Sequence, residues 1–303
     1  MGNQKLILQA ENMQKRIGEL ANAINALENQ VIILQQENKQ LKEDVACASR
    51  TILDIHEPIE HSASKPRKLI ADPAYDIKKV YAMMENRAPR TFGIYKELMK
   101  NGSDTYEQEG SPGCSAEGDV KSIHFSKFVR RYIHGNVLDI GCGPIELPIY
   151  LKGYPLECIY GLDPLLPYKE HPFSFVRGVA EAIPWEAKAF DTVVFATSFD
   201  HVFLVDVVME EVERVLADDG YLLIWIGLAE EAKPYNPYAS DFEPADKYHM
   251  FHNTKQNFEE LMETRFEIIE CYYYRWDATS HFYALRKKGG SHEIGNRTKN
   301  MEE

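Results

Sequence analysis

The sequence predicts an α/β fold with a mainly parallel sheet, preceded by a long N-terminal coiled-coil helix. Short apolar runs alternate with helical patterns between residues 121 and 288, and alternation of this kind predicts parallel strands joined by crossovers. The first apolar run ends in an acid followed by two glycines, and a heptad repeat lies near the N-terminus. We therefore expect a coiled-coil helix at 1–50, a linker and helical segment at 51–120, the α/β domain at 121–288 and a disordered tail at 289–303.

The heptad repeat extends over residues 6–45. One seam position holds Leu6, Met13, Leu20, Leu27, Leu34 and Leu41, and the other holds Ala10, Ile17, Ile24, Val31, Asn38 and Val45. β-Branched residues at a with leucine at d favour a two-stranded parallel coil, and an asparagine at an a position fits the same register. The sequence therefore predicts a homo-oligomer, a parallel dimer through residues 6–45. A trimer stays open, and a helix packed on its own domain is disfavoured by the narrow apolar stripe.

A glycine turn follows the first predicted strand of the α/β domain. The strand ends around Asp139, and Gly141 and Gly143 follow at once, so the backbone can approach a ligand closely. A second apolar run ends in Asp163, whose carboxylate can accept both hydroxyls of a ribose. The order strand, glycine turn, helix, strand, acid predicts a site for a nucleoside-containing cofactor.

The turn does not match a dinucleotide fingerprint. Gly141 and Gly143 are followed by Pro144, Ile145 and Glu146, so the third glycine of G-x-G-x-x-G is missing. The motif D-I-G-C-G-P at 139–144 resembles that of class I S-adenosylmethionine-dependent methyltransferases, especially the small-molecule type. The resemblance runs from about 121 to 288 and continues in order through segments 178–185, 190–196, 209–216 and 219–225.

This resemblance implies a Rossmann-like, seven-stranded, mainly parallel sheet with helices on both faces, closed by a hairpin of strands at 266–273 and 281–286. It also implies S-adenosylmethionine as the cofactor. Asp139 and the Gly141–Gly143 turn would hold the methionine end, Asp163 the ribose, and Ala180 and Glu181 would border the adenine.

The sequence departs from the family at two positions. Ile145 stands where the family often has glycine and is expected to crowd the methionine end, and Val179 stands where it often has an acid. In similar enzymes a helical segment before the fold lies over the cofactor, so Tyr75, Tyr81 and Tyr95 are expected either to form such a lid or simply to pack. Residues 101–118 are predicted to be a mobile loop.

The candidate catalytic residues follow the fourth predicted strand, where ligands of open α/β sheets bind. His201 is the first choice for a general base and Asp200 the second, with a positioning role for His201 as the alternative. His249 and His252 end a long aromatic insertion at 227–253 and supply weaker candidates. Oxygen and nitrogen ligands abound (Asp200, His201, Asp241, Glu243, Asp246, His249, His252), but they show no diagnostic metal spacing, so the sequence predicts no metal.

Composition narrows the function. The net charge of −13 disfavours nucleic acid as a partner, and the absence of a long apolar run predicts no membrane span. Five scattered cysteines are typical of a cytoplasmic protein. The aromatic insertion favours a small acceptor with sugar-like faces, methylated on oxygen, as in surface polysaccharide precursors.

Other functions remain open. A nicotinamide-dependent oxidoreductase is disfavoured by Asp139, Pro144 and Ile145. The second alternative is a scaffold that is dimerised by its coiled coil and whose sheet domain has lost turnover. Ile145 and Val179 would be the signs of that loss. A protein methyltransferase recruited by the coiled coil is the third alternative.

Overall fold

The computed structural model describes residues 16, 18, 30, 31, 67–109, 119–167, 169–273 and 279–289. The chain divides into two compact units, Met1–Ile52 and Leu53–Glu303. The four described residues of the first unit are helical. The rest of the predicted coiled coil, its dimer seam, the linker at 56–66 and nearly all of the predicted tail lie outside the described residues.

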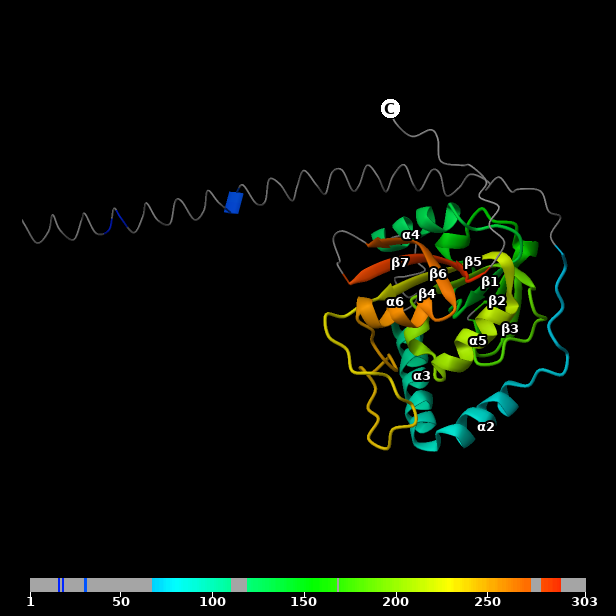
Figure 1. Cartoon of the computed structure of the whole chain (residues 1–303), viewed down its shortest axis with the longest axis horizontal. Coiled ribbons are helices and arrows are strands. Elements are labelled where there is room, and N and C mark those ends of the chain that lie inside the picture. The colour runs from blue at the N-terminus through cyan, green and yellow to red at the C-terminus, as the bar shows by residue number, and fades with distance from the viewer. Residues whose placement is uncertain are drawn as a thin grey trace, which may run out of the picture. The chain divides into compact units, whose positions relative to one another are not determined.

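The second unit is built on a sheet of seven described strands in the order β3-β2-β1-β4-β5-β7-β6 (Figure 1). The strands are β1 Val137–Ile140, β2 Ile159–Asp163, β3 Ser174–Arg177, β4 Phe190–Ala196, β5 Leu216–Gly227, β6 Phe266–Tyr273 and β7 Ser280–Lys287. Strands β1 to β5 pair in parallel, whereas β7 is antiparallel to both β5 and β6. The predicted Rossmann-like sheet with its closing hairpin is confirmed.

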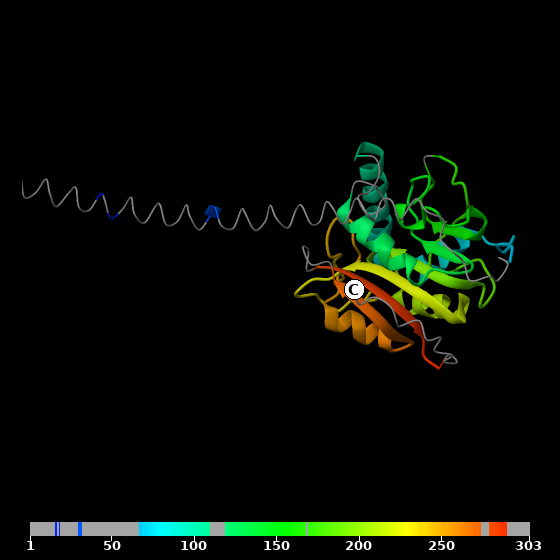
Figure 2. The same ribbon diagram turned by 90° about the horizontal axis from the view of Figure 1, so that it is seen from above.

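Helices cover both faces of this sheet (Figure 2). On one face lies α4, Val120–Arg130, whose Phe125 packs against Trp225 and Phe282 with ring centroids 5.4 and 5.2 Å away. On the other lies α6, Lys255–Glu263, whose Phe258 packs 4.9 Å from Tyr283, the neighbour of Phe282 along β7. Because successive side chains of a strand point to opposite faces, these contacts place α4 and α6 on opposite sides.

Two helices precede the sheet domain, α2 Ile77–Arg87 and α3 Pro89–Glu109. Pro89 begins α3, as expected for a residue that is favoured at the first position of a helix. The predicted loop from residue 101 is wrong, because α3 continues through it to residue 109. Contacts with the insertion explain this: Asn101 donates to the Lys247 carbonyl at 3.0 Å and Thr105 to the Tyr248 hydroxyl at 3.2 Å. Tertiary contacts of this kind override a weak local helix propensity.

The predicted helix between β1 and β2 is also absent. Residues 141–158 are all described, and they contain only two short 3-10 turns, η2 Ile149–Leu151 and η3 Leu156–Cys158. Pro148 and Pro155 stand directly before these turns, and a proline within a longer helix would remove a hydrogen bond and clash with the preceding turn.

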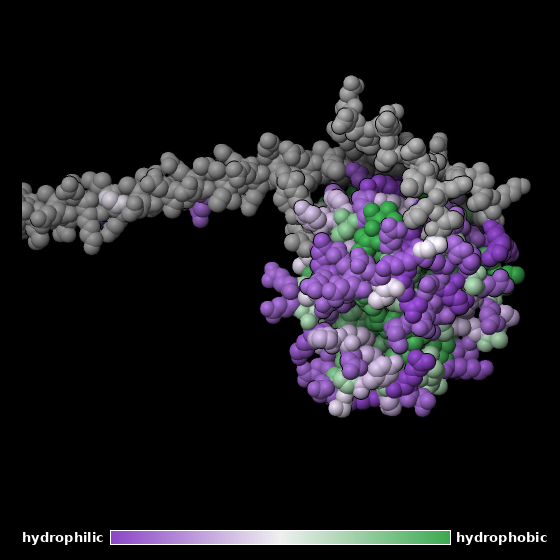
Figure 3. Space-filling model, viewed as in Figure 1, coloured by the Kyte–Doolittle hydropathy of each residue, from purple (hydrophilic) through white to green (hydrophobic). Residues whose placement is uncertain are grey.

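The surface of the second unit is mainly hydrophilic on the face seen in Figure 3, with hydrophobic residues visible between polar ones. Among the described helices, none has both the length and the apolar character that crossing a bilayer requires.

Candidate functional site

A cavity of about 480 Å³ opens beside the carboxyl ends of β1, β2 and β4. Its size is typical of a small-ligand site, and its position is where the strand order reverses and open α/β sheets bind ligands. The sheet domain contributes the predicted cofactor residues Gly141, Gly143, Asp163, Ala180 and Glu181, together with Val179, Thr197, Ser198 and His201. The insertion contributes Tyr248 and His249, and α3 contributes Tyr95, Leu98, Met99, Gly102, Thr105 and Tyr106.

The glycine turn forms one wall of this cavity, and both glycines have left-handed backbone conformations. The φ angle of Gly141 is +75°, and that of Gly143 is +72°. A Cβ added to Gly141 would lie 2.4 Å from the Cβ of Ser198, whereas one added to Gly143 would meet no described atom within 4 Å. Gly141 therefore allows two backbones to pack, and the space over Gly143 is open to a ligand.

Asp163 lies against the same turn. Its carboxylate accepts hydrogen bonds from the backbone N–H groups of Gly143 at 2.9 Å and Leu165 at 2.8 Å. Burial raises the pKa of Asp163 to about 6, although both hydrogen bonds act to lower it. Each carboxylate oxygen keeps acceptor capacity beyond its one backbone bond, so the pair is suited to two neighbouring hydroxyl groups.

Asp139 lies beneath the turn and does not line the cavity, in contrast to the other predicted cofactor residues. One carboxylate oxygen accepts a hydrogen bond from the Tyr150 hydroxyl at 2.9 Å, and the other has no hydrogen-bond partner among the described residues. Burial raises the pKa of Asp139 to about 7, and the nearby charge of Asp163 adds to this effect. The structure thus places Asp139 in the core below the turn.

The predicted adenine-side loop is held from two directions. The backbone N–H of Val179 donates to the Tyr75 hydroxyl at 3.3 Å, so a tyrosine from the segment before α2 covers this loop. Glu181 accepts from the backbone N–H groups of Phe203 at 2.7 Å and Leu204 at 3.0 Å, directly before α5, Val205–Val215. A carboxylate at this helix end stabilises the helix, so Glu181 ties the cavity wall to α5.

The end of β4 carries a strained turn. Thr197 lies on the cavity wall with a φ of +56°, which is costly for a β-branched residue. A short 3-10 helix, η4 Phe199–His201, follows and presents Asp200 and His201. Backbone strain of this kind is found where the surrounding structure fixes a functional geometry.

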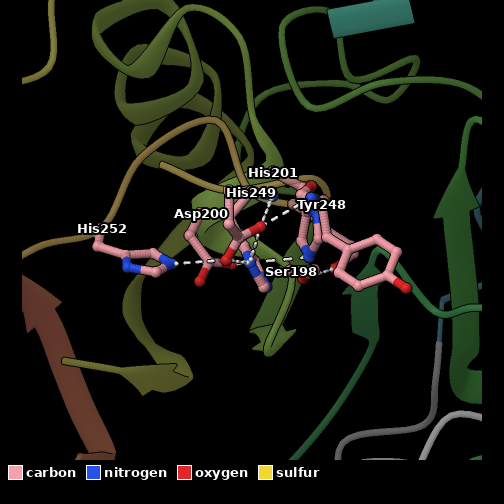
Figure 4. Close-up of polar contacts among 8 residues, drawn as sticks. Ser198, Asp200, His201, Tyr248, His249 and His252 are labelled. Carbon is pink, nitrogen blue, oxygen red and sulfur yellow. Dashed lines mark hydrogen bonds and ion pairs between the residues drawn. The ribbon is translucent and has the colours of Figure 1, made fainter. Parts of the chain in front are cut away.

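His201 is oriented by the insertion (Figure 4). Its Nδ1 lies 3.0 Å from the carbonyl oxygen of Tyr248, which can only accept, so Nδ1 carries the proton and Nε2 has the free lone pair. Burial lowers the pKa of His201, and the charge of Asp200 opposes this shift. The imidazole is therefore neutral near pH 7 and able to take a proton or bind a metal.

Asp200 lies beside this imidazole, with Oδ1 3.8 Å from His201 Nε2. Only 9 % of its side chain is exposed, and Oδ1 has no hydrogen-bond partner in the described part of the chain. A buried carboxylate oxygen without a partner is costly, and in native structures it calls for an explanation.

The insertion brings a second carboxylate and two further imidazoles to the cavity rim. Asp246 lies 2.8 Å from His249 Nδ1 and 3.3 Å from His252 Nε2. Although burial raises the pKa of Asp246, hydrogen bonds from His249 and Tyr248 lower it to about 2. The rings of His249 and His201 lie 4.7 Å apart, and both line the cavity, whereas His252 does not.

The structure therefore unites Gly141, Gly143, Asp163, Ala180, Glu181 and His201 around one cavity, with Asp200 directly behind His201. It places Asp139 below the turn and His252 outside the lining. Tyr95, which the sequence offered as a lid residue, does line the cavity. Sequence reasoning did not single out the other α3 residues of the wall, Leu98, Met99, Gly102, Thr105 and Tyr106. The α3 contribution had no local signal, since it depends on packing between residues more than 100 positions apart.

Residues 138–224 match a family model described as a methyltransferase domain. No curated protein sequence matches the chain. A 1,6-didemethyltoxoflavin-N1-methyltransferase from Burkholderia thailandensis, solved with 1,6-didemethyltoxoflavin and S-adenosylhomocysteine, is 13% identical with a TM-score of 0.48, over 72% of this chain and 93% of that chain. An S-adenosylmethionine-dependent methyltransferase from Aquifex aeolicus is 15% identical with a TM-score of 0.38, over 53% and 88%.

The substrates named for those two proteins belong to them alone at this degree of similarity. The family match covers the glycine turn, Asp163, the loop at 178–181 and the strand that ends at Ala196. Residues 138–224 of the sheet domain therefore resemble a methyltransferase domain, and this match supports S-adenosylmethionine as the cofactor.

Proposed function

We propose that this chain is an active methyltransferase that transfers the methyl group of S-adenosylmethionine to an oxygen of a small, sugar-containing acceptor. One observation carries the proposal: a single cavity joins the glycine turn and Asp163 at one side to His201, Tyr248 and His249 at the other. A donor and an acceptor can therefore meet in one cavity, which is the main requirement of a displacement reaction.

In this proposal the chain holds the cofactor through groups already described. Asp163 would accept hydrogen bonds from the ribose, the open space over Gly143 would take the methionine part, and Ala180 and Glu181 would border the adenine. When bound, the cofactor supplies an electrophilic methyl group on a positively charged sulfur, and the electron pair of the broken carbon–sulfur bond stays on sulfur.

The acceptor would lie against the rim formed by His201, His249 and Tyr248. Methylation of a hydroxyl requires loss of its proton as the oxygen forms its bond to the methyl carbon. His201 is the group best suited to promote this loss, because its Nε2 is unprotonated and Asp200 stabilises positive charge beside it. His252 would act indirectly, by holding Asp246.

Aromatic side chains support a ring-shaped acceptor only at this rim. Tyr248 lines the cavity, and α3 adds Tyr95 and Tyr106. Tyr235 instead packs 4.4 Å from Phe251 and donates to the Phe203 carbonyl at 2.6 Å, so part of the aromatic insertion is a packing element. Tyr248, Tyr95 and Tyr106 border the cavity, and the proposal assigns them to contact with a sugar or another flat ring.

Specific observations bear on two alternative functions. One sign of a turnover-deficient scaffold, Ile145, does not line the cavity, whereas the other, Val179, does; both glycines of the turn are part of the lining. A protein methyltransferase would need a wide groove, whereas α3 and the insertion are tied together across the rim through Thr105 and Tyr248. We further propose that residues 6–45 dimerise the enzyme in the cytosol, where its thiols stay free, as those of Cys142, Cys158 and Cys271 are.

Calorimetry tests the cofactor half of this proposal. S-Adenosylmethionine and S-adenosylhomocysteine are expected to bind the full chain, and Asp163→Ala is expected to weaken both by at least tenfold. Asp219→Ala, at an exposed position, is the matched control. Incubation with isotopically labelled S-adenosylmethionine and a panel of sugars and nucleotide sugars, followed by mass spectrometry, tests transfer. Cofactor binding with no product from any acceptor would favour the scaffold.

A further inference from the structure

We infer that Asp200, His201 and His249 form a binding site for one divalent transition-metal ion at the acceptor side of the cavity. One carboxylate oxygen of Asp200 and one ring nitrogen of each histidine lie within 4.8 Å of one another. Two imidazoles and a carboxylate are a typical ligand set for zinc and for ferrous iron, with positions left open for a substrate.

The orientation of both histidines supports this site. The Nδ1 of His201 is held by the Tyr248 carbonyl at 3.0 Å, and the Nδ1 of His249 is held by the Asp246 carboxylate at 2.8 Å. Metal-binding histidines almost always donate their second nitrogen to a carbonyl or carboxylate in this way, which fixes the ring and makes the ligand nitrogen more basic. In each ring Nε2 is then the nitrogen available to an ion.

The unpartnered oxygen of Asp200 is the independent observation that points to a ligand. Its side chain is 91 % buried, and Oδ1 has no hydrogen-bond partner within the described residues. It lies 3.8 Å from His201 Nε2, which is too long for a hydrogen bond but fits two ligands that share one ion at about 2.1 Å each. An ion bound here would give this oxygen the partner that it lacks among the described residues.

A second possible ligand set, Asp246 with His249 and His252, is less suited to hold the ion. Asp246 already accepts from the backbone N–H groups of Tyr248 and His249 and from the His249 ring. Its 2.8 Å distance to Nδ1 leaves no room for an ion between the two atoms. Asp246 and His252 are therefore assigned to the support of His249.

The role of this metal ion in catalysis rests on the proposed function. An ion held by Asp200, His201 and His249 would bind the acceptor oxygen, lower the pKa of its hydroxyl and release the proton to water before the oxygen attacks the methyl carbon. His201 would then act as a metal ligand instead of accepting the proton itself. The metal-binding test does not require either substrate or cofactor.

The test uses the full chain without a polyhistidine tag, stripped with a chelator and titrated with zinc. We expect one zinc per chain by elemental analysis and calorimetry. Asp200→Asn and His249→Gln should each weaken zinc binding 10- to 100-fold, and cobalt should give a visible absorption band that both variants lose. His134→Gln, which lies before the amino end of β1 and outside the cavity lining, is the matched control and should keep one zinc per chain. His252→Gln should still bind zinc, because His252 supports Asp246 and is not itself a ligand in this site. Circular dichroism checks that each variant is folded.

Less than about one tenth of a zinc per chain at saturation, or full binding by both Asp200→Asn and His249→Gln, would overturn the inference. Loss of zinc in His252→Gln with full retention in Asp200→Asn would also overturn it, by moving the ion to Asp246. S-Adenosylmethionine binding is measured on the same samples. Zinc binding without cofactor binding would contradict the proposed function but still support the metal site. Cofactor binding without zinc binding would contradict the metal site alone.

Discussion

Gly141 lies against the side chain of Ser198, so closely that a Cβ at position 141 would be 2.4 Å from the Cβ of the serine. The Ser198 hydroxyl also donates to the carbonyl oxygen of Ile140 at 2.5 Å. The turn after β1 and the turn after β4 are therefore packed as one unit. The position of the candidate catalytic residues after β4 therefore depends on the glycine turn after β1.

Gly141→Ala should destabilise the fold, whereas Gly143→Ala should mainly disturb the cavity. Both positions have left-handed φ angles and carry a similar strain of about 1–2 kcal/mol for alanine. Only position 141 adds a clash in the core, which brings the expected loss in the free energy of unfolding to roughly 3 kcal/mol. Urea denaturation and cofactor calorimetry on both variants separate the two effects. Equal losses of stability would contradict the packing argument.

Cofactor affinity should rise with pH through the titration of Asp163. Its pKa is raised to about 6 by burial, so only about one tenth of the free protein has this carboxylate ionised at pH 5. A carboxylate must be ionised to accept from both ribose hydroxyls, so affinity should be about tenfold weaker at pH 5 than at pH 7.5. Calorimetry between pH 5 and pH 7.5 measures this difference in cofactor affinity. In Asp163→Asn the affinity should be low and nearly independent of pH; a slope as steep as that of the native chain would assign the titration elsewhere.

Between pH 5.5 and 8, Asp139→Asn should lose less free energy of unfolding than the native chain does. The pKa of Asp139 is raised to about 7 in the fold, above its value in the unfolded chain. The folded state therefore keeps a proton that the unfolded state has lost, and its stability falls as pH rises towards 7. Between pH 5.5 and 8 this group contributes a loss of about 2 kcal/mol, which asparagine removes.

Urea denaturation at the two pH values measures this effect. Asp219→Asn, an exposed substitution, should show the same pH difference as the native chain. A native-like pH difference in Asp139→Asn would show that Asp139 is ionised throughout.

The sheet could be predicted from sequence because its strands are short, apolar and bounded by turns, as at Val137–Ile140 and Ile159–Asp163. That Gly141, Gly143, Asp163, Ala180 and Glu181 line one cavity was predictable for a related reason, because parallel strands bring their carboxyl ends to one edge of the sheet. Asp139 shows the limit: a residue next to the turn can face the core, and sequence spacing does not reveal the side.

The acceptor side was harder to predict, since it joins elements remote in sequence. Residues 101–109 are polar and contain a glycine, but hydrogen bonds to the Lys247 carbonyl and the Tyr248 hydroxyl favour the helix there. The Asp200–His201–His249 cluster likewise combines η4 with the far end of the insertion. No fixed spacing in the sequence encodes a contact of this kind.

Residues 6–45 should make the full chain a dimer. Light scattering coupled to size exclusion should give twice the mass of one chain, 34.8 kDa, and Leu20→Lys with Leu27→Lys should give the monomer. Because both substitutions lie at d positions, Gln14→Lys outside the seam is the control. A monomeric native chain would refute the dimer, and a threefold mass would identify a trimer.

Tyr75→Phe should weaken cofactor binding more than Tyr81→Phe does. The Tyr75 hydroxyl accepts from the backbone N–H of Val179 on the cavity wall, whereas the Tyr81 hydroxyl makes only a weak 3.9 Å contact with the sulfur of Met99 among the described residues. Loss of the Tyr75 oxygen leaves a backbone N–H without its partner, at a cost of about 1–3 kcal/mol. The adenine-side loop should become less ordered and cofactor affinity should fall severalfold. Calorimetry on both variants checks this order; equal affinities would mean that Tyr75 only packs against the loop.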